Sequence, residues 1–340
     1  MPARVVERTF VWVLLIILIF VASSALIQYV TSSPTPAGTE AAAKQQEFDS
    51  TQDQKFQSIL ETGNKSLQDG DYPQALSHYS EAERVVPQLR EEQYAALKTA
   101  RLQIAGIFEN AASRTESERL YKDMIESAFR DGAAQLNAGH TEAALERYQD
   151  AEKLAEHLTD GQRGYRIGAN QGEVKTLERM NRFPDAVQAS QTLIDYLQAA
   201  DPDDPAVVQA YMRMGETYQM QRDWQHLEAT LVTSAGICDQ ILRRNSGVPY
   251  NQDPVWKVSI SEDQILYALM DAYDQDGKPD QALATADTLY DLIAKYSTQW
   301  SELPTHGRND VANFAFRIAS RADRPDVASA WRAKIDPSRH

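Results

Sequence analysis

The chain contains very little cysteine, proline and glycine for its length. Among 340 residues there is one cysteine, Cys238, together with 14 prolines and 15 glycines. A single cysteine excludes an internal disulfide framework and any metal cluster that needs several thiolates. Few helix breakers, and a composition rich in Ala, Leu, Gln, Glu and Arg, indicate an all-α protein. Hydrophobic residues make up 42% of the chain, which is enough for a packed core and argues against global disorder.

Sequence motifs of catalytic, nucleotide-binding and metal centres are also missing. No Gly-x-Ser-x-Gly occurs, and the glycines spaced four apart from Gly164 to Gly172 follow no strand pattern; a close contact between helices accounts for them. The acidic run from Asp271 to Asp280 departs from a calcium-binding EF-hand loop, because Ala272 and Leu283 stand where acidic ligands are required. No histidine lies in a metal-binding pattern; the six are His78, His140, His157, His226, His306 and His340. We therefore expect no enzymatic activity, no metal and no cofactor.

Basic residues are outnumbered by acidic ones. The chain has 34 Lys and Arg against 49 Asp and Glu, which gives a formal net charge of −15. A protein of this charge has no broad basic face with which to neutralise phosphates. The composition therefore argues against nucleic acid as a partner.

Residues 9–30 form a long uncharged and mostly hydrophobic segment, TFVWVLLIILIFVASSALIQYV. A helix of about 20 apolar residues spans the roughly 30 Å hydrocarbon core of a bilayer. Arg4 and Arg8 precede the segment, and the next basic residue after it is Lys44. By the positive-inside rule, residues 1–8 are then a cytoplasmic tail. The sequence thus predicts a single-pass protein of the cell membrane whose remaining residues are extracytoplasmic.

A cleaved signal peptide is the alternative interpretation of this segment. Ser23 and Ala25 have the spacing of the −3 and −1 positions of a cleavage site, after an apolar region from Val11 to Val21. The uncharged run continues to Val30, which is longer than a signal usually needs and favours the anchor. Both interpretations export the rest of the chain.

Residues 31–43 follow as a predicted linker. The stretch TSSPTPAGT at 31–39 contains two prolines, a glycine and small hydroxyl residues, which do not build a packed element. Residues 44–340 then form the folded domain.

A pattern of small and aromatic residues repeats through this domain. Its first copy consists of Gly63, Gly70, Tyr72, Ala75, Tyr79, Ala82 and Pro87. The same offsets return at Gly132, Gly139, Ala144, Tyr148 and Ala151. This spacing resembles the tetratricopeptide repeat, in which small residues let two antiparallel helices approach closely. Further copies surround Gly215 and Gly277, and weaker ones surround Ala186 and Ala328.

The resemblance implies an α-solenoid of tetratricopeptide-like helix pairs over about residues 50–336, preceded by the transmembrane helix. The small residues at the expected helix contacts are 41 to 69 residues apart, whereas the standard repeat has a period of about 34. The helices or the loops are therefore longer than in the standard repeat.

Residues 88–124 interrupt the pattern. They contain a further helical pair, and Ser113 with Glu116 has the spacing of a capping box that starts a helix. Because no breaker follows until Gly139, either this helix breaks near Ile125 or the stack is discontinuous and divides into two lobes.

Residues 243–260 form the second interruption, with two prolines and a glycine. A second capping box, Ser261 with Gln264, is expected to start the next helix. Tyr250 and Trp256 make this segment either a partner-binding loop or a connector that packs back on the array.

The resemblance also implies that the first helix of each pair lines a groove. The partner-binding candidates are Leu60, Asn64, Leu67, Phe129, Leu136, Asn137, Met212, Glu216, Met220, Tyr267 and Asp271. Leu60, Phe129 and Tyr267 have packing within the array as their alternative. Some repeats of this family clamp a peptide carboxylate with Lys and Asn; Asn64 fits, but Leu60 stands where Lys is needed. An apolar groove edged with acids instead suits a neutral or basic segment of a protein partner.

These features together predict a membrane-anchored, extracytoplasmic scaffold for protein–protein interactions. Its layout is similar to that of bacterial single-span tetratricopeptide-repeat proteins, which suggests a role in the export, folding or assembly of envelope proteins. One alternative is an exported repeat protein that binds a small ligand or glycan, with the loop of Tyr250 and Trp256 as its lid. A further alternative is an enzyme of unrecognised type.

Overall fold

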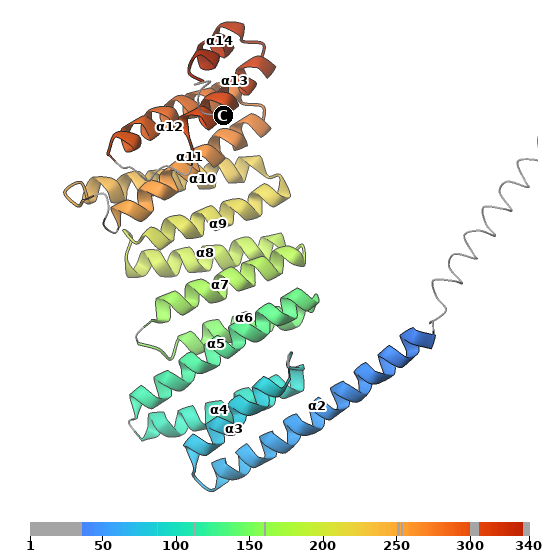
Figure 1. Ribbon diagram of the computed structural model, residues 1–340. Helices are drawn as coiled ribbons and strands as arrows, with labels where there is room; N and C mark the ends of the chain where they lie inside the picture. Colours follow the sequence, from blue (N-terminus) through green and yellow to red (C-terminus); the bar gives the residue numbers. More distant parts are fainter. Residues whose placement is uncertain are drawn as a thin grey trace, which may run out of the picture. The chain divides into compact units, whose positions relative to one another are not determined.

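A computed structural model describes residues 36–86, 88–111, 113–159, 161–249, 252, 254–299 and 306–335. Every regular element among them is an α-helix (Figure 1), which confirms the predicted all-α class. The predicted membrane segment at 9–30 and the loop residue Tyr250 lie outside the described residues. None of the described helices combines the length and the apolar character that a bilayer crossing requires. The described chain divides into two units, with the boundary between Ala100 and Arg101.

The first unit consists of α2 (Pro36–Gln68), α3 (Tyr72–Val85) and the first half of α4 (Glu91–Asn110). Gly70 adopts a φ of 78° in the turn between α2 and α3, a conformation that glycine adopts without strain. Asp71 then caps α3 by accepting a hydrogen bond from the Gln74 backbone N–H at 3.1 Å. A Cβ atom at Gly63 would lie 2.6 Å from the Tyr79 ring. The small residue predicted at this helix contact is therefore required by Tyr79.

The start of α2 differs from the predicted linker. Residues 36–43 are helical, because α2 begins at Pro36 and runs through Glu40-Ala-Ala-Ala-Lys44. Proline is well tolerated in the first turn of a helix, and Ala, Glu and Lys are strong helix formers. The prolines and the glycine at 31–39 therefore did not define how far a linker extends.

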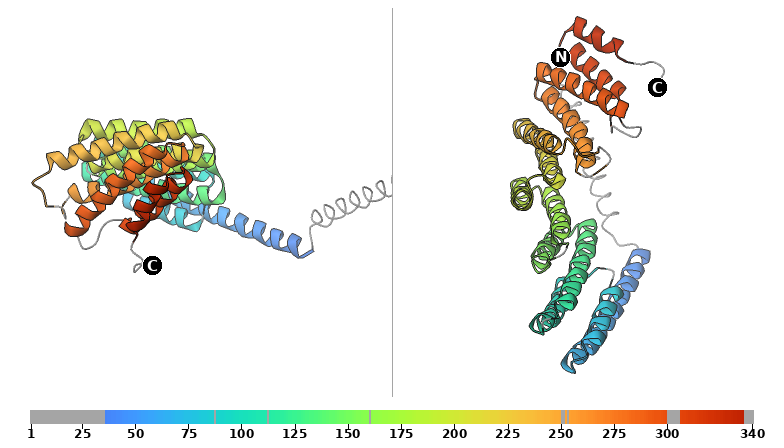
Figure 2. Two further views of the ribbon diagram at one scale, coloured as in Figure 1. Left: turned by 90° about the horizontal axis from the view of Figure 1, so that it is seen from above. Right: turned by 90° about the vertical axis from the view of Figure 1, so that its left-hand side faces the viewer.

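The second unit is a stack of antiparallel helix pairs that pack in chain order (Figures 1 and 2). After the end of α4, its helices are α5 (Arg114–Ala138), α6 (Thr141–Ala155), α7 (Gln162–Arg179), α8 (Phe183–Ala200), α9 (Pro205–Gln221), α10 (Trp224–Arg244), α11 (Val255–Gln275), α12 (Pro279–Gln299), α13 (Arg308–Arg321) and α14 (Pro325–Ala333). Some first helices also contact the first helix of the next pair, as α5 contacts α7 and α9 contacts α11. The predicted solenoid of helix pairs is thus present from α5 to α14.

Close contacts at glycine set the spacing of α5, α6 and α7. A Cβ atom at Gly132 of α5 would lie 3.2 Å from both the Arg147 Cβ and the Tyr148 ring of α6. A Cβ at Gly172 of α7 would overlap the same Tyr148 ring, and one at Gly168 would meet Phe129 at 3.2 Å. The close contact predicted for the glycine series is thus confirmed at Gly168 and Gly172. At Gly164, by contrast, a Cβ would meet nothing within 4 Å.

Helix α5 is continuous, so of the two alternatives for this region the break near Ile125 is absent. The helix runs from Arg114 to Ala138 with Ser113 as its N-cap, although the Ser113 side chain makes no capping hydrogen bond. The first half of α5 packs against the segment that follows α6, because Tyr121 stacks on His157 with the ring centroids 4.3 Å apart. The Tyr121 hydroxyl also donates to Glu109 at 3.0 Å, and Ile125 is fully buried.

Helix α11 starts earlier than the sequence predicted. It begins at Val255, and Ser261 lies inside it, where its hydroxyl donates to the Lys257 carbonyl at 3.0 Å. The predicted capping box at Ser261 is therefore wrong. The buried side chain of Val258 shows why, since it continues the apolar face of α11 into the core around Leu231 and Cys238. Trp256 consequently belongs to α11 and not to a loop.

We expect Gly132→Leu to lower the free energy of unfolding by about 2–4 kcal/mol, because the new side chain must displace α6 at Arg147 and Tyr148. Ala133→Leu is the matched control, since Ala133 is the next residue on α5 and is exposed. Urea unfolding followed by circular dichroism measures both. Equal unfolding midpoints for the two variants would contradict the close contact at Gly132.

Candidate partner-binding surfaces

Several predicted groove residues lie in the interior. Leu60 is 8% exposed in the first unit, and Leu136 is 4% exposed in the second, where it packs with Ala144 and Tyr148. These two residues hold helices together and are not available to a partner, so their assignment to a groove is wrong. Repeat spacing identifies the first helix of a pair but does not separate its inner face from its outer face.

Other candidates are half-buried against neighbouring helices. The Phe129 ring lies 6.3 Å from that of Tyr148, and Met212 packs against the core of α9 to α11. Asn64 accepts a hydrogen bond from the Tyr79 hydroxyl at 2.9 Å, and Leu67 is also half-buried. The alternative of packing within the array is therefore confirmed for Phe129.

Tyr267 is held in a stack with His306. The two rings are parallel within 2°, with centroids 3.8 Å apart. Asp263, which is 1% exposed, accepts a hydrogen bond from the His306 backbone N–H at 3.2 Å and lies 3.3 Å from its Nδ1. Burial raises the pKa of the Tyr267 hydroxyl above its ordinary value. This cluster joins the start of α13 to α11, so Tyr267 has a packing role. Its neighbour Asp271 is half-buried and accepts a bond from Gln275 at 3.4 Å.

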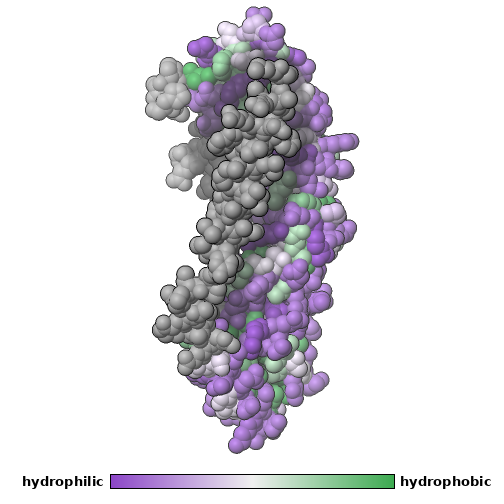
Figure 3. All heavy atoms as spheres, turned by 90° about the vertical axis from the view of Figure 1, so that its right-hand side faces the viewer, coloured by the Kyte–Doolittle hydropathy of each residue, from purple (hydrophilic) through white to green (hydrophobic). Residues whose placement is uncertain are grey.

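Asn137, Glu216 and Met220 remain exposed. Glu216 and Met220 lie one turn apart on α9, so they share one face of that helix. Met220 is 57% exposed, a high value for a large apolar side chain. We call the surface formed by Glu216, Gln219 and Met220 the α9 face. Figure 3 shows hydrophobic residues in small separate groups on a largely hydrophilic surface.

A buried polar network beneath the α9 face joins α7 to α9. The Glu178 carboxylate is 6% exposed; it accepts a hydrogen bond from the Thr217 hydroxyl at 2.7 Å and pairs with Arg213. Arg213 also pairs with Glu216. Sequence reasoning missed this network because its members are 35 and 39 residues apart and have no local signature.

A cavity of about 330 Å³ opens between α6, α7 and α8. Its lining is mainly polar and consists of Gln149, Glu152, Asn170, Glu173, Leu177, Arg182, Asp185, Gln188, Ala189 and Thr192. None of the predicted groove residues lines it. No sequence pattern predicts this cavity, since each helix contributes only a few residues to it.

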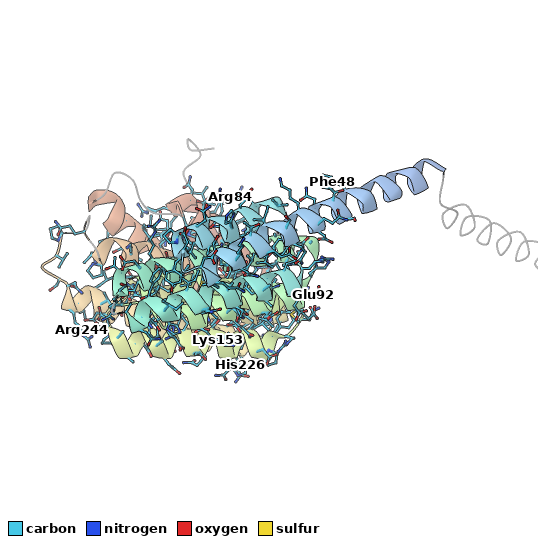
Figure 4. The ribbon with its side chains drawn as sticks, turned by 90° about the horizontal axis from the view of Figure 1, so that it is seen from below. Phe48, Arg84, Glu92, Lys153, His226 and Arg244 are labelled. Carbon is cyan, nitrogen blue, oxygen red and sulfur yellow. The ribbon has the colours of Figure 1, made fainter. Side chains whose placement is uncertain are left out.

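Cys238 and Phe48 differ in how far they are buried: Cys238 lies in the core, whereas Phe48 lies on the surface. Cys238 is fully buried beside Ile241, and burial raises the pKa of its thiol far above the ordinary range. Cys238 is thus a small core residue. Phe48 on α2, labelled in Figure 4, is 54% exposed. Single exposed apolar residues of this kind are common on soluble surfaces.

Glu173→Gln should stabilise the fold at neutral pH and have little effect in acid. Burial, aided by the charge of Glu152, raises the pKa of the Glu173 carboxyl, against the lowering effects of Gln149 and Arg182. An acid whose pKa is raised by folding destabilises the folded state once ionised; below its unfolded value of about 4.3 that cost is absent. Urea unfolding at about pH 7 and about pH 4 measures the difference. The exposed Asp291→Asn is the control, and an E173Q effect that does not depend on pH would contradict the argument.

No family model and no curated protein matches the chain. Among solved structures, the tetratricopeptide-like repeats of a putative kinesin light chain from Podosopora anserina are 14% identical; the match covers 62% of this chain and 94% of that chain, with a TM-score of 0.40. RapI in its apo form is 10% identical over 82% of this chain and 75% of its own, with a TM-score of 0.47. A signal-transduction ATPase with a tetratricopeptide-repeat sensor, from Pyrococcus horikoshii, is 12% identical. The match covers 90% of this chain and 44% of that chain, with a TM-score of 0.42.

These solved structures are too distantly similar to identify the type of repeat. It has to be judged from how the helices of each pair pack in this chain. Gly63 meets Tyr79, Gly132 meets Tyr148, and Gly215 would place a Cβ 3.2 Å from Leu227, each time between the two helices of one pair. Left-handed glycines at Gly70 and Gly139 end the first helix of the first two of these pairs, as the repeat requires. The described helix pairs therefore pack in the way expected of tetratricopeptide-like repeats.

Proposed function

We propose that the chain is a membrane-anchored scaffold whose extracytoplasmic repeats bind protein partners. The observation that carries this proposal is the stack from α5 to α14, in which successive pairs place their helices side by side (Figures 1 and 2). Stacked pairs of this kind offer extended surfaces on which a peptide or a helix can lie. A role in the export, folding or assembly of envelope proteins follows from combining such a surface with an anchor.

The α9 face is the proposed centre of partner contact. Met220 supplies an exposed apolar side chain, while Glu216 supplies a carboxylate one turn away. Arg213 pairs with both Glu216 and the buried Glu178, so it holds Glu216 in place. A fixed carboxylate beside an apolar side chain suits a neutral or basic segment, in keeping with the net charge of −15.

The anchor is proposed from residues 9–30, with Arg4 and Arg8 on the cytoplasmic side. The alternative of a soluble exported ligand-binding protein relied on a lid formed by Tyr250 and Trp256. It is weakened because Trp256 is part of α11.

The topology is tested by protease treatment of intact cells that express the full chain. We expect the repeats to be digested without permeabilisation, because Arg4 and Arg8 retain the N-terminus inside. Intact protein in the membrane fraction should begin at Met1 or Pro2, whereas a signal peptide would leave a shorter N-terminus. Repeats that resist protease until the membrane is opened would place them in the cytoplasm and contradict the proposal.

Partner binding is tested by in-cell chemical cross-linking of the Met220→Glu variant. We expect roughly a tenfold loss of cross-linked partner, since a new charge at the centre of an apolar contact typically costs over 1 kcal/mol. Val232→Glu on α10 is the matched control, because Val232 is 50% exposed and lies outside the α9 face. An equal effect of both substitutions would show that the α9 face has no special part in binding.

A further inference from the structure

The cavity between α6, α7 and α8 is lined by both apolar and charged residues. Its apolar surface comes mainly from Ala189, because Leu177 is 2% exposed, whereas carboxylates come from all three helices, as Glu152, Glu173 and Asp185. Its volume of about 330 Å³ lies at the lower end of the roughly 300–1,000 Å³ found for ligand sites. A site of this size accommodates one long side chain more readily than a cofactor.

The three carboxylates differ in how their charge is balanced. Glu152 pairs with Arg166 at 3.1 Å, and Asp185 pairs with Arg182 at 2.7 Å. Glu173 accepts a hydrogen bond from the Gln149 side-chain amide at 2.9 Å, but it forms no salt bridge with any described residue. It is also half-buried, and burial raises the pKa of its carboxyl. Arg182 is near enough to lower the pKa of this carboxyl, but its salt bridge is with Asp185. The cavity thus holds one partly desolvated carboxylate that has no salt bridge among the described residues.

We infer that this cavity receives a lysine or arginine side chain from a protein partner, with Glu173 as the counter-ion. The aliphatic stem of such a side chain would lie on Ala189, beside the buried Leu177, and its charged head would reach Glu173. Gln188 and Thr192 on α8 are placed at the cavity to meet the partner's flanking backbone. This inference rests on the proposed scaffold function and adds a second contact point, on helices other than α9.

Disulfide exchange at the cavity measures its preference for a cation without knowledge of the partner. Thr192→Cys in the full chain, purified in detergent, is equilibrated with cysteamine, which carries an ammonium group, and its disulfide cystamine, or with uncharged 2-mercaptoethanol and its disulfide. The protein thiolate attacks the small disulfide, forms the mixed disulfide and releases one small thiol. Intact-mass spectrometry then reports each mixed disulfide. Thr288→Cys on α12 is the matched control, because both threonines are exposed and each donates to the carbonyl four residues before it. Thr288 also has acidic neighbours, Asp287 and Asp291. The native Cys238 is buried.

The preference of each position is the ratio of its mixed disulfide with cysteamine to its mixed disulfide with 2-mercaptoethanol. We expect this ratio to be roughly threefold to fivefold higher at position 192 than at position 288, as for a single partly shielded ion pair. Adding Glu173→Gln should abolish this excess at position 192 while leaving the value at 288 unchanged. The same preference at both positions, or an excess that survives Glu173→Gln, would overturn the inference.

Photo-cross-linking from position 188 in cells identifies the source of the cation. Protein peptides captured at Gln188 should be enriched in Lys or Arg near the cross-link, relative to those captured at the exposed Gln281 of α12. If a protein is captured from position 219 of the α9 face but not from position 188, the inference is overturned in favour of a free small amine in the cavity. The proposed function would then still stand. An absence of capture at all three positions would overturn both.

Discussion

The packing of Tyr148 between two glycines determines the geometry of the second unit. Its ring fills the space that side chains at Gly132 of α5 and Gly172 of α7 would need, so one residue of α6 sets the distance to both neighbouring first helices. The adjacent Arg147 is fully buried and pairs with Asp131 at 2.8 Å. A buried ion pair adds little net stability, but it penalises any shift that separates its members. Together these contacts fix how α5, α6 and α7 lie, and hence where the cavity above α7 can open.

Polar contacts between residues far apart in sequence then tie helix ends together, both between successive pairs and, for Arg244 at the end of α10 and Asp203 before α9, within one pair. Arg163 pairs with Asp204, Arg244 with Asp203, and Arg324 with Asp280, at separations of 41 to 44 residues; Arg244 is labelled in Figure 4. Each such pair is partly exposed and contributes little alone. Asp204 is different, because it is 5% exposed and also caps α9 through the Ala206 backbone N–H. The contacts thus specify which helix follows which, while the apolar cores provide the stability.

The helix pairs were predictable because steric requirements leave local traces. Gly63, Gly132 and Gly70 occupy positions where a side chain is excluded or a left-handed backbone is needed. Helix boundaries were less predictable: Pro36 starts a helix in a stretch predicted as a linker, and Ser261 lies inside α11 despite its capping-box spacing. In both places the neighbouring residues, strong helix formers or a buried apolar face, outweighed the local signal.

The candidate surfaces were predictable only in part, because they depend on which face of a helix meets the next pair. The repeat pattern placed Leu136 and Gln219 at equivalent positions, four residues after Gly132 and Gly215, yet Leu136 is in the core and Gln219 is exposed. The cavity combines Gln149, Glu173 and Gln188, which share no spacing that a repeat would impose. Its charge is unbalanced because Glu152 and Asp185 form salt bridges with arginines, whereas Glu173 forms none among the described residues. A repeat fold therefore fixes where binding surfaces can form, while the chemistry of each surface depends on side chains that the repeat leaves free to vary.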